Sequence, residues 1–306
     1  MRIGAFELVS DAVLGPMAGV SDLGFRTLAR RYGAGLTYTE MVSVCGLMYR
    51  NQKTEVLTAV APCETPSAIQ LFGSDPEVFF KAARHEAVAK FDIIDINMGC
   101  PVHKVVSRGE GSALMKDPAR AADIVRATGE GAAGKPVTVK MRAGWDKPIA
   151  PAFALAMQEA GAAAVTVHGR TRSQMYTGKA DWNVIHEVVG AVSIPVIANG
   201  DVRSVEDYHA VKQQTGAAGV MIARGAIGHT SLFAEIRGET PTVDLQADFT
   251  LQLRLLRESF SDHVACMLLK PHLISAVTGR RGAKELRYAV GTAKTIEDIE
   301  SIIRQL

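Results

Sequence analysis

The sequence predicts an α/β fold, a (β/α)8 TIM barrel followed by a small C-terminal helical domain. Short runs rich in Val, Ile, Ala and Thr alternate with helical stretches, which is typical of a parallel sheet built from repeated βα units. The strand-like runs cover residues 12–19, 35–40, 67–73, 92–97, 136–142, 163–169, 194–200 and 218–224. Eight such runs with helices between them indicate a closed barrel.

Helix start signals support this alternation. Stretches 75–89 and 117–131 each open with an aspartate at the cap position and a proline at the first helical position. Past Gly238–Pro241 the strand-like runs stop, and the remaining text is helical in four stretches: 248–264, 268–279, 283–291 and 295–306. We therefore expect a catalytic barrel domain at residues 1–239 and a helical domain at residues 240–306.

The composition is that of an ordinary globular chain. Its 306 residues are 47% hydrophobic, and a net charge of +2 means that any nucleic-acid binding must depend on a local basic surface. Four scattered cysteines form no C-x-x-C pair, so we expect free thiols and no metal. No signal-peptide pattern or long apolar run occurs, which predicts a cytoplasmic protein that does not bind membranes.

The run Phe91–Pro101 carries the strongest functional signal. Its β-branched body predicts a buried strand, and it ends in Asn97, Gly99 and Cys100, residues that contribute little to a core. Barrel enzymes keep their chemistry at the carboxyl ends of the strands. Cys100 is therefore a candidate acid or nucleophile, and the alternative is a buried cysteine without a catalytic role.

Other strand ends also carry residues suited to a flat, phosphorylated ligand. The first strand ends in Pro16, Met17 and Ala18, a tight apolar loop that could lie along a ring or be a plain turn. Gln70 is an amide within an apolar strand, and it needs partners if it points inward. Lys140 and Arg142 alternate on one strand, so both face the barrel mouth; an ion pair between Lys140 and Asp95 is the structural alternative.

The last three strand ends add a histidine and a candidate phosphate site. His168 is followed directly by the basic loop of Arg170 and Arg172. The seventh run ends in Asn199, Gly200 and Asp201, and the eighth ends in Ala223, Arg224 and Gly225. Loops after strands seven and eight of such barrels commonly bind phosphate. Because no G-x-G-x-x-G opens a helix, the set fits FMN better than a dinucleotide.

The ordered motifs GPMAGVSDLGFR, QLFGSDP, DINMGCPVHKVV, VKMRAGW, VHGRTRSQMYTGKADW, IPVIANGDV and GVMIARGAIG resemble those of the tRNA-dihydrouridine synthase family. The resemblance covers about residues 10–235. It implies an FMN-dependent enzyme that reduces the C5–C6 double bond of specific uridines in tRNA, with NADPH as reductant. It also implies that Cys100 is the proton donor.

The resemblance assigns roles to individual residues. It implies that FMN is bound by Pro16, Met17, Ala18, Gln70, Lys140, Asn199, Gly200, Asp201, Ala223 and Arg224, with His168 close to the flavin. It places Asn97 and Arg142 at the uracil, and Arg170 and Arg172 at the uracil or the RNA backbone. The target uridine must leave its stack to reach such a pocket.

The C-terminal region provides a basic surface for tRNA, with a solvated charged face as the alternative. Between residues 270 and 294 its cations are Lys270, Arg280, Arg281, Lys284, Arg287 and Lys294, against the single acid Glu285. The family pattern of Arg-Lys-His followed by aromatic residues is reduced here to Lys270 and His272, and Glu110 stands where many relatives have a small residue. We expect a monomer.

Two other functions are compatible with parts of the pattern. One is an FMN barrel that acts on a small pyrimidine, as dihydroorotate dehydrogenase does. The other is a tRNA-binding protein without catalysis. The cofactor set and Cys100 favour the synthase over both, and the motifs do not specify which uridine is reduced.

Overall fold

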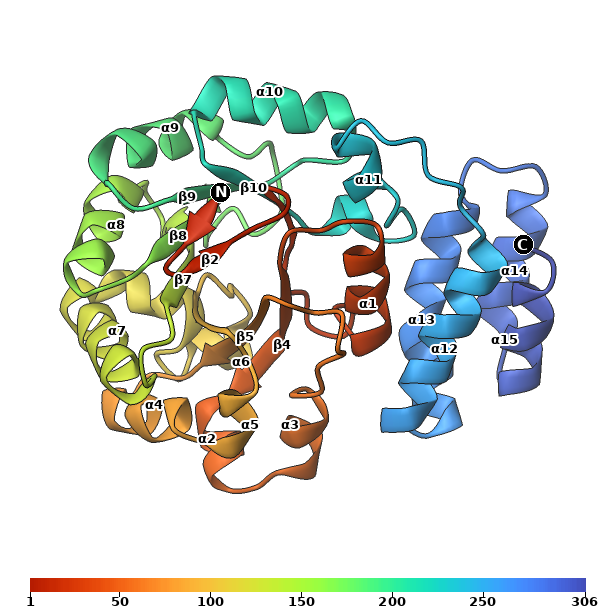
Figure 1. Cartoon of the computed structure of the whole chain (residues 1–306), viewed down its shortest axis with the longest axis horizontal. Helices are drawn as coiled ribbons and strands as arrows, with labels where there is room; N and C mark the ends of the chain where they lie inside the picture. The colour runs from red at the N-terminus through yellow and green to blue at the C-terminus, as the bar shows by residue number, and fades with distance from the viewer.

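The structure is a computed structural model that describes residues 1–306, except the side chain of Lys53. Eight parallel strands close into a barrel in the order β10-β3-β4-β5-β6-β7-β8-β9 (Figure 1). The strands are β3 (Ala12–Leu14), β4 (Thr37–Ser43), β5 (Ser67–Phe72), β6 (Ile93–Met98), β7 (Val137–Gly144), β8 (Ala164–Thr171), β9 (Val196–Asn199) and β10 (Gly219–Ile222). Each lies in or overlaps one predicted run, so the TIM-barrel prediction is confirmed.

Helices surround the barrel as a second layer (Figure 1). The longer ones are α1 (Leu23–Arg31), α4 (Pro76–Ala83), α7 (Pro118–Gly131), α8 (Ala150–Glu159), α9 (Trp182–Ala191) and α10 (Val205–Thr215). Shorter segments are α2 (Val44–Met48), α3 (Gln52–Val56), α5 (Glu86–Ala89), α6 (His103–Val106), α11 (Leu232–Ile236) and the 3-10 turns η1 (Gly111–Lys116) and η2 (Arg224–Ala226). Outward-facing strand residues such as Val139 and Met141 pack beneath these helices.

Two predicted helices are each divided in the structure. The stretch 75–89 splits because His85 is extended, and its Nδ1 accepts from the amide of Ala87 to start α5. The stretch 248–264 splits because Phe260 and Ser261 are extended between α12 (Leu245–Ser259) and α13 (Asp262–Val277). Both breaks occur where a residue with extended backbone provides the cap of a new helix, a local choice that apolar periodicity does not reveal.

An N-terminal hairpin, which the sequence pattern did not predict, closes the barrel at the amino ends of its strands. Strands β1 (Arg2–Ile3) and β2 (Phe6–Glu7) pair antiparallel and lie over the barrel centre in Figure 1. Ile3 and Leu8 are buried against inward-facing residues that include Val13 and Leu36. This apolar cluster therefore fills the amino end of the barrel, whereas polar inward-facing residues lie toward the carboxyl end.

The C-terminal helices pack around an apolar cluster of their own. These helices are α12, α13, α14 (Ala283–Thr292) and α15 (Ile296–Ile303), and their shared core includes Leu253, Leu269 and Ile299. They lie beside α1 (Figure 1), where the hydroxyl of Tyr32 donates to Asp248 at 2.6 Å. The division into domains at residues 239 and 240 stays a prediction. No helix in the described chain is both long and apolar enough to span a membrane.

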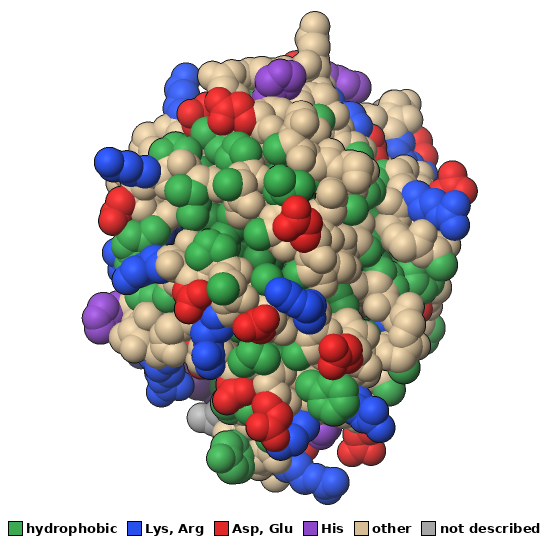
Figure 2. Space-filling view, turned by 90° about the vertical axis from the view of Figure 1, so that its left-hand side faces the viewer, with side chains coloured by type: hydrophobic (Ala, Val, Ile, Leu, Met, Phe, Trp, Pro, Cys, Tyr) green, Lys and Arg blue, Asp and Glu red, His purple; other side chains and the backbone are tan. Residues whose placement is uncertain are grey.

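The outer wall of the barrel carries mixed charge. On the side turned away from the C-terminal helices, acidic and basic side chains are interspersed over the surface (Figure 2). Interspersed charges create no extended field of one sign. This side of the barrel therefore offers no extended basic surface for an anionic ligand.

Candidate active site

A cavity of about 610 Å³ lies at the carboxyl ends of the strands and brings most of the predicted site residues together. The predicted residues that line it are Pro16, Met17, Ala18, Asn97, Cys100, Lys140, Arg142, His168, Asn199, Gly200, Asp201, Ala223 and Arg224. Gln70, Arg170 and Arg172 do not line it. The cavity has the size of a cofactor site, and cationic and amide groups from separate strands converge on it.

Cys100 is held by a turn at the end of β6. The side-chain Oδ1 of Asn97 accepts from the amides of Gly99 at 3.1 Å and Cys100 at 2.9 Å. On the far side, the Cys100 carbonyl accepts from the amide and hydroxyl of Ser112. The residue is 9% exposed, and burial raises the pKa of its thiol despite the nearby cations Arg142 and Lys140. The thiol is therefore protonated at neutral pH, which suits an acid and not a nucleophile.

Gln70 lies beneath the cavity floor and has no exposed surface. Its Nε2 donates to Asp95 Oδ2 at 2.7 Å, and its Oε1 accepts from Asn97 Nδ2 at 2.8 Å. The amide that we expected to contact the cofactor thus connects two protein side chains. Its direct role in cofactor binding stays a prediction.

Lys140 points into the cavity from β7, where its Nζ donates to Asn199 Oδ1 at 3.1 Å. The Asn199 amide is oriented by a second bond, from Nδ2 to the carbonyl of Met221 at 2.8 Å. Burial and the adjacent Arg142 lower the pKa of Lys140 to about 8. The alternative ion pair with Asp95 does not form among the described residues, since Asp95 accepts instead from Gln70 and Thr138.

Arg142 connects the loops that follow β6 and β8. Its Nε donates to the carbonyl of Gly99 at 2.8 Å, and its Nη1 donates to the carbonyls of Thr171 and Met175. Its guanidinium lies 5.4 Å from the ring of Tyr176. Only the Nη2 group is not used by these carbonyls, so any contact with a substrate must come from that group.

Tyr176 is a cavity residue that the sequence reasoning missed. Its side chain is 54% exposed, and the guanidinium of Arg224 lies 5.2 Å from the same ring to which Arg142 is close. Two cations near one ring are a favourable electrostatic arrangement. The signal was present, because Tyr176 is in the quoted motif, but a loop residue without charge gives no pattern of its own.

His168 is neutral in this setting. Burial lowers the pKa of its ring to about 2, and the cations Lys140, Arg142 and Arg170 add to the effect. Nη1 of Arg170 lies 3.3 Å from His168 Nε2. Because a guanidinium can only donate, Nε2 accepts and the ring proton is on Nδ1. The imidazole thus offers one N–H donor and no charge.

Arg170 and Asp201 form a bidentate ion pair beside the cavity, with Nη2 at 2.9 Å and 2.7 Å from the two carboxylate oxygens. The carboxylate also accepts from the amide of Ala180 at 2.7 Å. These bonds outweigh the effect of burial and lower the pKa of Asp201. Arg170 faces a neighbouring groove that includes Lys179, so its contact with a substrate stays a prediction.

Arg172 lies away from the cavity. Its guanidinium is 4.6 Å from the ring of Trp145, and Nζ of Lys116 is 4.9 Å from the same ring. Its buried Nε has no hydrogen-bond partner among the described residues. The predicted contact with the uracil is not supported by this position, whereas a contact with RNA outside the cavity stays a prediction.

The loops after β8, β9 and β10 approach one another closely where glycines permit it. Gly200 has φ +127°, and a Cβ there would lie 2.6 Å from the Cβ of Ala180. A Cβ at Gly225 would lie 2.2 Å from the carbonyl oxygen of Val202. With Arg224 beside them, these backbones offer amides and a cation at one end of the cavity, an arrangement suited to phosphate.

Comparisons with known proteins agree with this geometry. Residues 13–297 match the family model described as dihydrouridine synthase (Dus). The chain is 39% identical over 302 residues, 95% of its length and 91% of the relative's, to a probable tRNA-dihydrouridine synthase of Rickettsia conorii. It is 38% identical to the tRNA-dihydrouridine synthase B of Pseudomonas putida, covering 94% of this chain and 88% of that protein.

The fold also resembles a solved enzyme structure. The old yellow enzyme homologue from Zymomonas mobilis (NCR) superposes with a TM-score of 0.55 at 14% identity, covering 80% of this chain and 93% of that one. At this identity the likeness supports the barrel fold alone.

Proposed function

Because the chain belongs to the dihydrouridine synthase family, we propose that its cavity holds FMN and that Cys100 protonates a uridine of tRNA during reduction to 5,6-dihydrouridine. The observation that carries the proposal is one cavity that combines a buried, protonated thiol with four cationic side chains and the strand-end amides of Asn97 and Asn199. NADPH is the reductant we expect.

The donor set of the cavity fits FMN. Arg224 and the glycine-bearing loops after β9 and β10 suit the phosphate, and the apolar segment Pro16–Ala18 suits one face of the ring system. Lys140 and the Nδ1–H of neutral His168 are donors for polar ring atoms. A cavity of about 610 Å³ admits a ligand of this size.

FMN, once reduced by NADPH, would supply the hydride that C6 of the base accepts. The charge that then develops on the uracil requires a proton at C5, and the Cys100 thiol is the group that provides it. One hydride and one proton together saturate the C5–C6 bond, and the resulting thiolate is reprotonated from solvent. We infer that Arg142 stabilises the charge on the uracil carbonyl oxygens.

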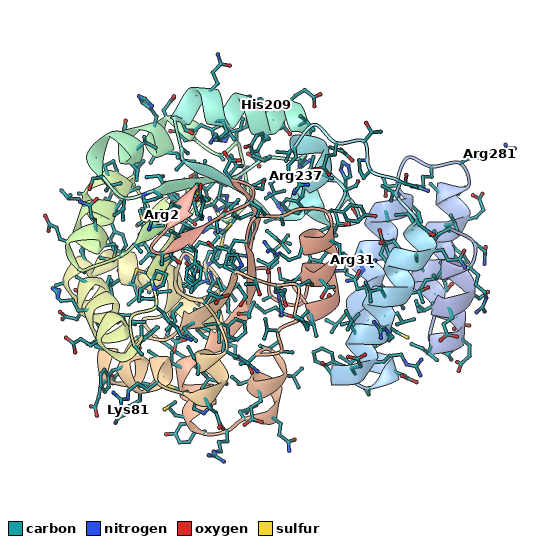
Figure 3. The ribbon with its side chains drawn as sticks, in the orientation of Figure 1. Arg2, Arg31, Lys81, His209, Arg237 and Arg281 are labelled. Atoms are coloured by element: carbon teal, nitrogen blue, oxygen red, sulfur yellow. The ribbon has the colours of Figure 1, made fainter. Side chains whose placement is uncertain are left out.

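The C-terminal helices supply the candidate tRNA surface. Arg280, Arg281, Lys284 and Arg287 are exposed, and none forms an ion pair with another described residue. Arg281 projects outward at the far end of these helices (Figure 3). Tyr288, which follows Arg287 in sequence, is 74% exposed. Unpaired cations beside an exposed aromatic ring suit phosphate contacts and base stacking. Lys270 differs from these residues, because its Nζ already donates to the carbonyl of Ala293, and its contact with tRNA stays a prediction.

The proposal is tested with purified protein loaded with FMN. We expect NADPH and unmodified tRNA to yield dihydrouridine, measured by mass spectrometry of the digested RNA, and no turnover of free orotate. Turnover of orotate without dihydrouridine would favour an enzyme of small pyrimidines. Binding of tRNA without any turnover would favour a non-catalytic RNA-binding protein.

A further inference from the structure

A continuous chain of buried hydrogen bonds connects Asp95 to the backbone of Cys100. Asp95 Oδ2 accepts from Gln70 Nε2 at 2.7 Å, and Gln70 Oε1 accepts from Asn97 Nδ2 at 2.8 Å. Asn97 Oδ1 then accepts from the amides of Gly99 and Cys100. Asp95 and Gln70 are 0% exposed and Asn97 is 6% exposed, so water does not substitute for these partners.

The polarity of this chain is fixed from its backbone end. The amides of Gly99 and Cys100 can only donate, so the oxygen of the Asn97 amide must face them. Its NH2 group then faces Gln70, which must present its own oxygen there. The Gln70 NH2 group is thereby directed at position 95, where only an acceptor satisfies it.

Strand register explains how the chain forms. Gln70 is the neighbour of Asp95 across β5 and β6, and Asn97 follows Asp95 by two positions, so all three point inward. The second oxygen of Asp95 accepts from the hydroxyl of Thr138 on β7 at 2.6 Å. That bond holds the carboxylate but is not part of the path to Cys100.

We propose that Asp95 is a positioning residue, which fixes the Gln70 and Asn97 amides and thereby the position of the Cys100 thiol. The proposal rests on the proposed function, since it assigns Asp95 to the same proton transfer. Without an acceptor at position 95, the Gln70 amide loses its partner and rotates. Asn97 then loses one of the two bonds that orient its NH2 group and keeps only the contact with Met41 Sδ at 3.1 Å, so that the turn that carries Cys100 can shift.

Three variants of similar size separate positioning from packing. Asp95→Leu fills the site but cannot accept. Asp95→Asn can still accept from Gln70 through its amide oxygen. Thr138→Val removes the other bond to Asp95 and leaves the path to Cys100 intact. If Asp95→Leu does not fold, Gln70→Met interrupts the same path one step later.

Each variant is assayed with FMN bound, for kcat and KM with tRNA, for FMN content and for thermal stability. A shift of about 1 Å in a reacting group can cost roughly 100-fold in rate, so we expect Asp95→Leu to lower kcat about 10- to 100-fold. KM and FMN content should stay near wild type. Asp95→Asn should restore most of the rate, and Thr138→Val should retain it.

A second measurement does not depend on turnover. In a background carrying Cys45→Ser and Cys63→Ser, the exposed thiols are removed, and the iodoacetamide reaction rate of Cys100 reports its setting. We expect Asp95→Leu or Gln70→Met to change this rate several-fold, and Thr138→Val to leave it unchanged. Wild-type kcat and alkylation rate in Asp95→Leu, or in Gln70→Met if the former does not fold, would overturn the proposal.

The outcome is distinguishable from failure of the proposed function. If Cys100→Ala turns over at the wild-type rate, Cys100 is not the acid and the proposed function fails in that respect. If Cys100→Ala abolishes turnover while Asp95→Leu does not affect it, only the positioning role of Asp95 fails. Equal loss of rate in Asp95→Leu and Thr138→Val would assign the effect to packing around Asp95.

Discussion

Gln252 donates through Nε2 to Asp22 Oδ2 at 3.1 Å, so that helix α12 is bonded to the residue that caps helix α1. His272 of α13 approaches the same carboxylate, with its Nε2 3.7 Å from Asp22 Oδ2. The His272 ring packs on the ring of Phe25 with 4.5 Å between centroids. Asp22 lies four residues after Ala18, the last residue of the loop Pro16–Ala18. The C-terminal helices therefore contact the base of the segment that we assign to the cofactor.

Asp22 and His272 predict opposed effects of pH on stability. Burial raises the pKa of Asp22 from 3.8 to about 6, so its contribution is present below about pH 4 and is lost as pH rises through 6. Burial lowers the pKa of His272 from 6.5 to about 4, so its contribution is present above about pH 6.5 and is lost as pH falls through 4. In wild-type protein the two effects offset each other.

Single variants should expose each effect. We expect Asp22→Asn, which can still cap α1, to lose stability more steeply than wild type on acidification from about pH 6.5 to 4.5. His272→Gln should show the opposite change of slope. Urea unfolding at several pH values in this window measures both. The assignment is wrong if both variants keep the wild-type dependence.

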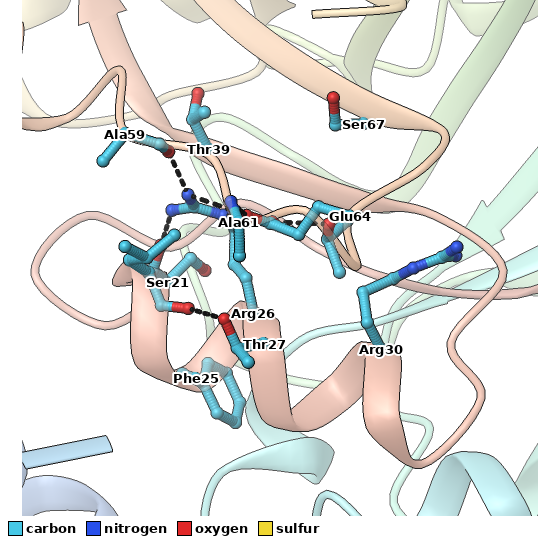
Figure 4. Close-up of polar contacts among 12 residues, drawn as sticks. Ser21, Phe25, Arg26, Thr27, Arg30, Thr39, Ala59, Ala61, Glu64 and Ser67 are labelled. Carbon is cyan, nitrogen blue, oxygen red and sulfur yellow. Dashed lines mark hydrogen bonds and ion pairs between the residues drawn. The ribbon is translucent and has the colours of Figure 1, made fainter. Parts of the chain in front are cut away.

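The buried ion pair of Arg26 and Glu64 should be far more important for stability than a surface pair. Arg26 Nε lies 2.8 Å from Glu64 Oε1, both side chains are at most 3% exposed, and the guanidinium also donates to the carbonyls of Ser21 and Ala59 (Figure 4). Glu64→Gln leaves the arginine buried without its counter-charge. We expect a loss of about 3 kcal/mol in the free energy of unfolding.

The matched control is Glu77→Gln, which breaks the exposed pair of Lys81 and Glu77 on α4. Its cost should be below about 0.5 kcal/mol, because solvent screens such pairs. Denaturant unfolding of both variants gives the comparison. Similar losses in the two would contradict the importance of burial.

The barrel was predictable because its signals are local and repeated. Val139 and Met141 alternate with Lys140 and Arg142, so the sequence of this strand alone indicates its buried outer face and its polar inner face. The hairpin at Ile3 and the break at His85 were not predictable in this way. Each depends on a contact or a backbone angle at a single residue, and a periodic pattern averages over such details.

The site was predictable by residue type and not by contact. Sequence reasoning placed Gln70 at a polar layer but could not tell that both ends of its amide are used by Asp95 and Asn97. The family resemblance assigned Arg172, together with Arg170, to the uracil or the RNA backbone. A register shift between β7 and β8 lies close to Thr171, and Arg172 instead packs on Trp145. Side-chain partners across strands are a property of the closed barrel.

Cys100→Ala should abolish turnover without loss of binding. General acid catalysis contributes about 100- to 10,000-fold, so we expect kcat to fall by at least about 100-fold, with FMN content and tRNA affinity near wild type. Cys266→Ala, a buried cysteine of α13, is the control and should turn over normally. Mass spectrometry of dihydrouridine measures both. Wild-type turnover in Cys100→Ala would remove the acid role.

The pH dependence of turnover should report the same thiol. Because burial raises the pKa of Cys100 above its usual 9.0, the protonated form persists through neutral and mildly alkaline pH. The contribution of the thiol to kcat should therefore be constant at neutral pH and decline only at alkaline pH. A decline centred near neutral pH that is absent in Cys100→Ala would contradict the raised pKa.

Arg224→Ala should weaken cofactor binding. A charge-assisted bond contributes roughly 1.5–3 kcal/mol, so the Kd for FMN should rise about 10- to 100-fold if this guanidinium binds the phosphate. Riboflavin, which lacks the phosphate, should bind the variant and wild type alike. Flavin fluorescence titration measures both ligands. Arg237→Ala, an exposed arginine paired with Glu239, is the control for loss of charge alone.

The cations of the C-terminal helices should contribute to tRNA affinity through phosphate contacts. We expect the double variant Lys284→Ala and Arg287→Ala to weaken tRNA binding at low salt. The slope of log K against log salt concentration should become less steep by roughly 1 to 2, since each lost phosphate contact releases one counterion fewer on binding. The control removes two exposed cations from the barrel wall, Lys81→Ala and Arg126→Ala. Binding is measured by filter retention across a salt series. If both double variants lose affinity equally, net charge explains the effect; if neither does, the cations of the C-terminal helices form only a solvated face.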